Sequence, residues 1–575
     1  MSNFNLNGAN ITSDVKFEKH KIWIPSAKLA SDNKLIFCFK NSYVTNSAGL
    51  HYYKDTDAKT YIFSHLEPFF CHRFFPCFDQ PSIRGTLRLQ VLSPKKNWQI
   101  IANGSEKAKP LHVSEHIDQV KAAAYANDYF DWLVQSKVQQ RNLWFWQFDL
   151  TPAISSYIYN LCAGDYDVIE NNRKDAKTPM RIFVRSSKKN YVDSDLVFRV
   201  ITQGIEFYAK MFDYPFPFAK YDVIYCPEFR ISAMENVGAV TFSDRYLIPS
   251  NEIDDAQMTL HYYIHLHELA HMWFGDLTTM VWWNDLWLKE SFADFLSATC
   301  IHEVVHTEDP SFNDTGSLFL SFLGAGLYAD LKPSTHPISV EIKHTGEAAS
   351  NFDMISYRKG ASWIKTMDYF IGRPALSLAC QKYCKRFKYS NAKLDEFVEC
   401  LDEAVKEANS TNQIDVKQWT DSWLKSAGPS QLECAVDQDC MTITQSFPKY
   451  ADEVYRSQAI EVTLILKNKE GEAFAHIMPN VLVESQAETK VKLELPENDG
   501  VLAIMPNSGN HGYCRVVLSS AQVAYFNENL MKCPITQYDR SYMWRILADH
   551  VTQARFSGND FVRRVIKELA NETQG

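Results

Sequence analysis

The spacing of hydrophobic and polar residues divides the chain into stretches of different structure. Between residues 33 and about 168 apolar and polar positions alternate, as in residues 87–91, LRLQV, and a period of two is typical of half-buried strands. From about residue 194 the apolar positions recur every three or four residues, in segments 194–212 and 256–274. This spacing predicts amphipathic helices. An antiparallel β domain followed by a helical region is therefore expected.

Alternation returns in the C-terminal third of the chain. A turn cluster at residues 428–430, GPS, is expected to end the helical region. Residues 462–464 and 491–495 then alternate again, which predicts a small β-sandwich. The last 40 residues or so have the helical period, so the chain is expected to close with helices.

Composition narrows the class of protein. The 575 residues are 46% hydrophobic and 22% charged, an ordinary balance for several globular domains, and the net charge is -10. Because no block of positive charge stands out, a nucleic-acid partner is not expected. The polar N-terminus lacks the pattern of a signal peptide and no apolar run approaches membrane-spanning length, so a cytoplasmic protein without a membrane span is predicted. The 13 scattered cysteines favour free buried thiols over a disulfide framework.

One short segment predicts a metal site. Residues 267–271 read His-Glu-Leu-Ala-His, and two histidines four residues apart share one face of a helix and can bind one ion. Glu268 then lies beside the metal rather than on it. Zinc needs a third protein ligand and an open position for water, and Glu290 on a second helix is the candidate. One Zn²⁺ per chain, bound by His267, His271 and Glu290, is therefore expected.

Neighbouring residues leave alternatives open. His261 and His265 are also four residues apart, but no glutamate follows His261, so they are interpreted as ordinary helix residues. Asp294, one turn after Glu290, either accepts the second ring proton of a ligand histidine and fixes its tautomer, or is a solvated helix charge.

Four further blocks of sequence accompany the histidine segment. Glu290 lies within residues 287–293, which read WLKESFA. Upstream, residues 232–236 read SAMEN, and residues 66–81 contain LEP followed by FPCFDQP. Downstream, residues 356–360 read SYRKG.

With these blocks the chain resembles the aminopeptidase N family of gluzincin zinc metallopeptidases. The family's versions are W-L-N-E-[GS]-F-A, G-A-M-E-N, Q-F-E-P followed by F-P-C-F-D-E-P, and Y-x-K-G. Lys289 therefore stands where asparagine is usual, Ser232 replaces glycine, and His65 stands where glutamine is common. Because the blocks occur in the right order along nearly the whole chain, the resemblance is specific.

The resemblance implies a role for each site residue. Glu268 is the expected general base, and Tyr357 is expected to donate a hydrogen bond to the oxygen that gains charge during hydrolysis. Glu235 and Glu67 are expected to bind the free amine of a peptide substrate. The resemblance implies substrate binding for the rest of the SAMEN block as well, namely Ser232, Ala233, Met234 and Asn236.

The resemblance also implies an α+β multidomain fold. The expected parts are an N-terminal antiparallel β domain (residues 1–170), a mainly helical thermolysin-like zinc domain (171–428), a small β-sandwich (429–526) and the start of a truncated C-terminal helical domain (527–575). Compared with the family the chain looks short at both ends. Its oligomeric state is left open.

The expected activity is removal of single residues from the N-termini of peptides. One alternative is a leukotriene hydrolase-like epoxide hydrolase, whose usual G-G-M-E-N differs from SAMEN here. A second is a catalytically incomplete, zinc-binding fragment that acts as a binding protein, although the presence of Glu268 and Tyr357 disfavours it. A general endopeptidase is a third, disfavoured by the amine-binding block.

Overall fold

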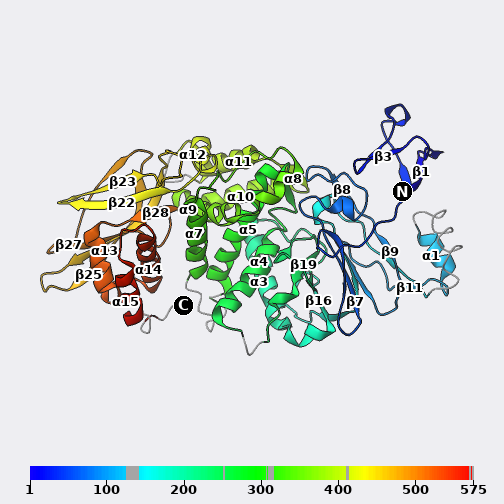
Figure 1. Ribbon diagram of the computed structural model, residues 1–575, viewed down its shortest axis with the longest axis horizontal. Coiled ribbons are helices and arrows are strands. Elements are labelled where there is room, and N and C mark those ends of the chain that lie inside the picture. Colours follow the sequence, from blue (N-terminus) through cyan, green and yellow to red (C-terminus); the bar gives the residue numbers. More distant parts are fainter. Residues whose placement is uncertain are drawn as a thin grey trace.

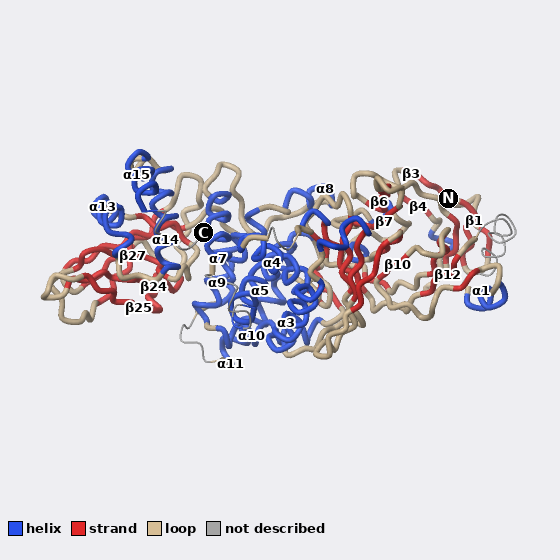
Figure 2. The backbone as a smooth tube through the Cα atoms, turned by 90° about the horizontal axis from the view of Figure 1, so that it is seen from below, coloured by secondary structure: helices blue, strands red, loops and turns tan. Residues whose placement is uncertain are grey.

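The parts of the chain follow one another along the long axis of the molecule. The structure is a computed structural model that describes residues 1–124, 142–249, 253–305, 307, 316–408, 414–568 and 572. Strands of the N-terminal part lie at one end, helices form the centre, and a second β region with the C-terminal helices lies at the other end (Figure 1). The view from below shows the same order (Figure 2). The predicted α+β multidomain organisation is confirmed.

The N-terminal part consists of small, mainly antiparallel sheets. A four-stranded sheet has the order β10-β14-β7-β6, a three-stranded sheet β11-β12-β9, and another β2-β1-β5, while β3 pairs β4 and β8 pairs β13. The bounds are β1 Ser2–Leu6, β2 Ala9–Asn10, β3 Lys16–Glu18, β4 Lys21–Trp23, β5 Leu35–Cys38, β6 Gly49–Lys54, β7 Thr60–His65, β8 Arg84–Gly85, β9 Gln90–Ser93, β10 Gln99–Ala102, β11 Leu111–His112, α1 Ile117–Ala123, β12 Trp144–Gln147, β13 Ile154–Ser155 and β14 Leu161–Gly164.

One predicted strand is shorter than its pattern. Regular pairing in residues 87–91 starts only at Gln90, with β12 as the partner. The backbone N–H of Leu87 donates instead to the side-chain oxygen of Thr151, at 2.8 Å. At the start of this segment a side-chain acceptor thus takes the place of the backbone acceptor that a paired strand would provide.

A five-stranded sheet connects the N-terminal part to the helices. Its order is β15-β16-β17-β19-β18, with parallel pairing between β16, β17 and β19 and antiparallel pairing at both edges. The bounds are β15 Tyr166–Glu170, β16 Arg181–Arg185, β17 Asp222–Cys226, β18 Ala233–Met234 and β19 Ala239–Ser243. The boundary expected at residue 170 falls between two paired strands of this sheet. Edge strand β18 contacts helix α4 (Asp255–Ala270), so the sheet edge lies beside the histidine segment.

The helical centre forms around α3, α4 and α5. Its elements are α3 Ser194–Phe212, α4 Asp255–Ala270, β20 Thr278–Met280, α5 Leu286–Cys300, α7 Ser317–Asp330, α8 Thr345–Ala348, the π-helical turn Ile355–Lys359, α9 Gly360–Ile371, α10 Arg373–Phe387, β21 Ser390–Ala392, α11 Leu394–Glu407 and α12 Val416–Leu424. Helix α3 has the bounds that the hydrophobic period predicts. Helix α4 begins with a capping box between Asp254 and Gln257 and ends at Ala270, four residues before its predicted end. Tight turns and a positive φ of 133° at Gly275 direct the chain away from the helix there.

Aromatic packing fixes the end of α4 against α5. The ring of Phe274 stacks on Phe292 of α5 with centroids 4.1 Å apart, and on Tyr383 of α10 at 5.0 Å. All three side chains are buried. Offset stacking of this kind adds to the free energy gained by burial. The relative position of α4 and α5, which carry the predicted metal ligands, is therefore set by the core itself.

Within the described residues 430–568, two sheets are followed by three α-helices. One sheet has the order β26-β23-β22-β28 and the other β25-β24-β27. The bounds are β22 Ser430–Asp437, β23 Cys440–Ser446, β24 Gln458–Lys467, β25 Ala473–Val483, β26 Glu488–Lys492, β27 Val501–Ser508, β28 Cys514–Val517, α13 Ser520–Asn529, α14 Gln537–Thr552 and α15 Gly558–Glu568. Strand β24 is central in its sheet and almost wholly buried.

Two expectations about the whole chain can be compared with the described residues. All 13 cysteines are free thiols, as their spacing predicts. Among the described helices, none combines the length and the apolar character that crossing a bilayer requires. The cytoplasmic location stays a prediction.

The contact between α9 and α5 generates a stability prediction. A Cβ at Gly360 would lie 1.9 Å from Oγ and 2.8 Å from Cβ of Ser291, the residue after Glu290. Gly360→Ala must therefore push α9 away from α5 and is expected to lower the free energy of unfolding by about 1–3 kcal/mol, as measured by urea titration. Gly558→Ala is the control, because its Cβ would meet only Val551, at 3.5 Å. Equal stability of the two variants would contradict this packing.

Candidate metal centre and active site

The predicted site residues meet in one cavity of about 590 Å³. Its wall is built by segments far apart in the sequence: the loop after β7, the loop and edge strand at β18, helices α4 and α5, and the turn before α9. The lining includes Glu67, Glu235, Glu268, Tyr357 and the three predicted metal ligands.

The three predicted metal ligands face one another. The Nε2 atoms of His267 and His271 are 3.1 Å apart, and Oε2 of Glu290 lies 3.4 Å from the first and 3.5 Å from the second. All three side chains are buried. The sequence spacing thus predicted their proximity correctly.

Both histidine rings are oriented by hydrogen bonds from Nδ1. The Nδ1–H of His271 donates to the carbonyl oxygen of Phe274 at 3.0 Å, and the Nδ1–H of His267 donates to Oδ1 of Asp294 at 3.0 Å. With the proton on Nδ1, each Nε2 lies on the side of Glu290 and can bind a metal ion.

Asp294 itself is held on both oxygens. The hydroxyl of Tyr263 donates to Oδ1 at 2.6 Å, and Arg358 donates to Oδ2 at 2.9 Å. Asp294 is fully buried. Of the two readings left open for Asp294, the geometry therefore matches the partner of a ligand histidine and not a solvated helix charge.

The ligand atoms fit the requirements of zinc. For metal–ligand distances of about 2.0–2.2 Å, a tetrahedron has edges of roughly 3.3–3.6 Å, close to the three separations in this cluster. Two imidazoles and one carboxylate are a ligand set of catalytic zinc sites, which keep one position open for water. Two other carboxylate-containing groups close enough to share an ion, Glu235-Glu268-His271 and Glu67-Glu235-Glu290, overlap with this cluster.

Glu268 and Tyr357 lie on the cavity wall near the cluster. Glu268 follows His267 on α4 and is buried. Tyr357 lies in the turn before α9, and its ring is stacked on His267 with centroids 6.2 Å apart and planes inclined by 17°. Burial raises the pKa of Tyr357 well above its usual value, and Glu290 raises it further. The phenol therefore keeps its proton and can donate a hydrogen bond.

Glu67 and Glu235 come together from different domains, joined by a lysine. The ammonium of Lys289 lies 2.6 Å from Oε1 of Glu235, 2.8 Å from Oε1 of Glu67 and 2.6 Å from Oε1 of Glu290. Burial acts to raise the pKa of Glu67, and the charge of Lys289 opposes this shift. For Lys289 burial acts to lower the pKa, but the carboxylates, Glu235 foremost, raise it well above its usual value.

The remaining residues of the SAMEN block divide into two groups. Ser232 and Ala233 line the cavity, and the hydroxyl of Ser232 is 2.9 Å from that of Tyr246. Met234 and Asn236 are buried, and the described cavity lining does not include them. The amide of Asn236 donates to Tyr159 O at 3.2 Å and accepts from Thr241 at 3.1 Å. Met234, in β18, and Asn236 therefore lie in the core, and their predicted role in substrate binding stays a prediction.

His65, which stands where glutamine is common, is a neutral buried ring. Its Nδ1–H donates to the carbonyl oxygen of Ser47 at 3.0 Å. Burial lowers its pKa to about 4. It therefore contributes an uncharged wall to the cavity.

Sequence reasoning missed three residues of the site. Tyr263 and Arg358 hold Asp294, and Lys289 joins the carboxylates. Tyr263 precedes His267 by one helical turn, so helical spacing offered a signal for it. Nothing in the sequence indicated that Lys289 would reach Glu67.

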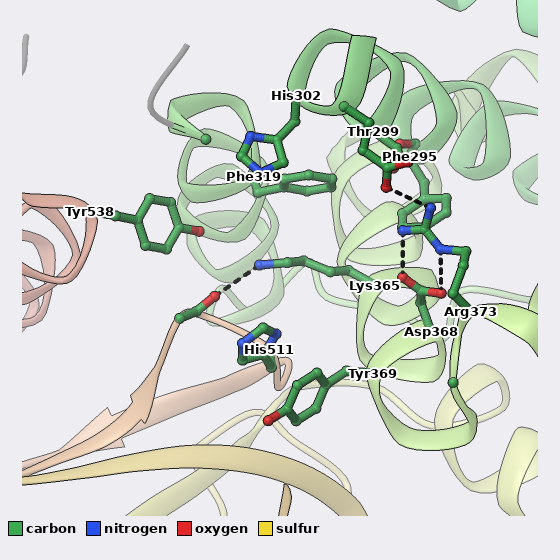
Figure 3. A pocket seen from close by; sticks show the side chains of 14 residues that line it. Phe295, Thr299, His302, Phe319, Lys365, Asp368, Tyr369, Arg373, His511 and Tyr538 are labelled. Atoms are coloured by element: carbon green, nitrogen blue, oxygen red, sulfur yellow. Dashed lines mark hydrogen bonds and ion pairs between the residues drawn. The ribbon is translucent and has the colours of Figure 1, made fainter. Parts of the chain in front are cut away.

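A second cavity, of about 570 Å³, lies among α5, α9, the turn after β27 and α14 (Figure 3). The half-buried Lys365 donates there from its ammonium to the carbonyl oxygens of Asn510 at 2.6 Å and Gly509 at 3.1 Å. Arg373 forms two hydrogen bonds with Asp368, both at 2.8 Å. All groups of described residues that could share a metal ion lie in the first cavity, which is therefore the candidate active site.

Two stretches of the sequence match models of known families. Residues 197–423 match the Peptidase family M1 domain, and residues 5–122 match the Peptidase M1 N-terminal domain.

Curated relatives match a longer stretch. An "Aminopeptidase N" from Streptomyces lividans is 33% identical over 446 residues, which are 77% of this chain and 47% of that protein. A "Leucyl aminopeptidase" from Saccharolobus solfataricus is 26% identical over 90% of this chain and 60% of its own length. A "Tricorn protease-interacting factor F2" from Thermoplasma volcanium is 26% identical over 91% of this chain and 58% of its own length. The chain spans about half the length of the relatives it matches.

The turn that carries Tyr357 generates a pH prediction. Asp353 accepts the backbone N–H groups of Ile355 and Ser356 at 2.9 and 3.0 Å, and its second oxygen lies 2.7 Å from Nε2 of His336. The hydrogen bond to Asp353 raises the pKa of His336 above its usual value, against burial and the charge of Lys359.

The stability that this pair contributes has a defined pH window. Because the folded pKa is raised, the contribution is fully present below about pH 6.5, the ordinary histidine pKa, and is lost as pH rises through the folded value. His336→Gln is therefore expected to lower the urea midpoint more at pH 6 than at pH 9. His344→Gln, in an exposed pair with Glu347, is the control and should change little. An equal loss for His336→Gln at both pH values would contradict the assignment.

Proposed function

Since the chain belongs to peptidase family M1, we propose that it is a zinc-dependent aminopeptidase that hydrolyses the N-terminal peptide bond of peptides with a free N-terminus. The observation that carries this proposal is the cluster of His267, His271 and Glu290 beside two carboxylates, Glu67 and Glu235, in one cavity. The first group suits a catalytic zinc, and the second suits an ammonium.

The ion would be bound by the two Nε2 atoms and the Glu290 carboxylate. Bound there, zinc supplies a water of lowered pKa and polarises the scissile carbonyl. Asp294 keeps the His267 ring in the tautomer that leaves Nε2 free, and Tyr263 and Arg358 hold Asp294.

Glu268 is the proposed general base. It accepts a proton from the attacking water and passes it to the nitrogen of the leaving amine. Its place on α4, one residue after His267 and on the wall of the same cavity, supports this role. Tyr357 is proposed to donate its O–H to the carbonyl oxygen as charge develops there, and the loss of such a donor typically costs about 2.7–4 kcal/mol.

Glu67 and Glu235 account for the preference for N-termini. A free peptide amine has a pKa of roughly 7.7–8.0 and is largely cationic at neutral pH. Two buried carboxylates at the end of the cavity bind this cation and so place the first peptide bond near Glu268. An endopeptidase has no need of such a pair.

The base assignment generates the first test of function. Glu268→Gln is expected to lower the rate of chromophore release from alanyl and leucyl amides by about 100-fold or more, because the amide cannot accept the proton. Zinc content should stay near one ion per chain, since Glu268 is not a proposed ligand. Glu399→Gln, an exposed glutamate of α11, is the matched control. Undiminished release by the Glu268 variant would refute the base assignment.

A further inference from the structure

Lys289 occupies an unusual place among the site residues. Its side chain is 2% exposed, and it lies behind the carboxylates that line the cavity. The stem packs near Gly275, and the ammonium lies 5.5 Å from the ring centre of Tyr157. From this buried side the ammonium reaches Glu235, Glu67 and Glu290 at 2.6–2.8 Å.

The contact with Glu67 differs from the contact with Glu235. Lys289 donates a well-aligned hydrogen bond to Glu235, at 2.6 Å. Oε1 of Glu67 lies 2.8 Å from the ammonium but receives no aligned hydrogen bond among the described residues, although it is buried. That oxygen is therefore held by the charge of Lys289 alone. Because Glu67 also lines the cavity, its carboxylate can still accept an N–H from a ligand there.

The ammonium of Lys289 is chemically equivalent to the group that Glu67 and Glu235 are proposed to bind. A substrate's N-terminal ammonium would have to share both carboxylates with a positive charge already in contact with them. Two like charges that share one pair of acceptors repel each other, and the protein interior screens this repulsion less than water does. The lysine thus opposes the binding of a cation at the place where the substrate amine is expected.

We propose that Lys289 is a specificity-determining residue that weakens the preference of the site for a cationic N-terminus, an inference that rests on the proposed function. Its ammonium donates a hydrogen bond to Glu235 and neutralises part of the negative charge of Glu67 and Glu235. The Glu67 carboxylate is then the acceptor that remains for the substrate amine. The site therefore binds free amines less tightly than a site with the same two carboxylates and no neighbouring lysine would. It consequently discriminates less between free and blocked N-termini.

Binding of a small amine tests the proposal without turnover. Leucinol carries a free amine and has no peptide bond to hydrolyse, and N-acetyl-leucinol is its blocked counterpart. Calorimetry on the zinc-loaded chain should show that Lys289→Met binds leucinol at least about tenfold tighter than the unaltered protein, because one positive charge a few ångströms away is removed. Binding of N-acetyl-leucinol should not change. A purely structural role of Lys289 would alter both ligands alike.

Two further variants control for the loss of a buried charge. Lys220→Met removes a buried lysine that pairs with Asp222 at 2.8 Å in the five-stranded sheet, and its ligand affinities should not change. Lys289→Asn is the alternative if the methionine variant does not fold, since its shorter side chain is polar and neutral. If neither Lys289 variant folds, the affinities of the two ligands are compared on the unaltered protein. Leucinol should then bind less than about tenfold more tightly than N-acetyl-leucinol.

The results that would overturn this proposal differ from those that would refute the proposed function. Unchanged leucinol affinity in a folded Lys289 variant, or a preference of the unaltered protein for leucinol above about tenfold, would overturn the proposal. Zinc content and amide hydrolysis of the unaltered chain are measured separately. A chain that hydrolyses peptides while its Lys289 variants bind leucinol no tighter refutes this inference alone, whereas a chain that binds no zinc refutes the proposed function.

Discussion

Four buried glutamates meet in one cavity, and their mutual repulsion is the constraint on which the rest of the site depends. Glu67, Glu235, Glu268 and Glu290 are each less than one-tenth exposed. Buried charges of one sign persist only when cations or hydrogen-bond donors compensate them. Lys289 is one such cation. A divalent ion at the histidines and an ammonium at Glu67 are the other two that the proposed function supplies.

The surrounding structure fixes these charges in place. Phe274 packs between α5 and α10, which sets the end of α4, and its carbonyl oxygen orients His271. Asp294 orients His267 from α5. Helices α4 and α5 and the turn after α4 therefore carry both the ligands and the groups that orient them. The stacking of aromatic rings in the core thus acts directly on the geometry of the site.

Part of this arrangement could be predicted from the sequence. Hydrophobic period predicted α3 with its correct bounds, and a four-residue spacing predicted that His267 and His271 share a face. The end of α4 was placed too late, because the period continues through residue 274 while the turn depends on Gly275. The hydrophobic pattern shows which face of a helix is buried, but it does not show the backbone conformation at which the helix ends.

The rest depends on contacts between distant segments. Lys289 meets Glu67 and Glu235 only because β7, β18 and α5 converge, and no spacing in the chain encodes that distance. Met234 and Asn236 share a motif with Glu235 but lie outside the described cavity lining. Met234 follows Ala233 in β18, where successive side chains face opposite sides. A motif thus identifies the segment that reaches the site, while the fold determines which of its side chains enter it.

X-ray absorption at the zinc edge tests the central claim most directly, because it reports the ligands of the bound ion. The account predicts a first shell of nitrogen and oxygen atoms at about 2.0–2.2 Å, with the outer-shell scattering of two imidazoles. His267→Ala should remove one of these imidazole contributions. A shell containing sulfur at about 2.3 Å, or a protein that retains no zinc, would contradict the account.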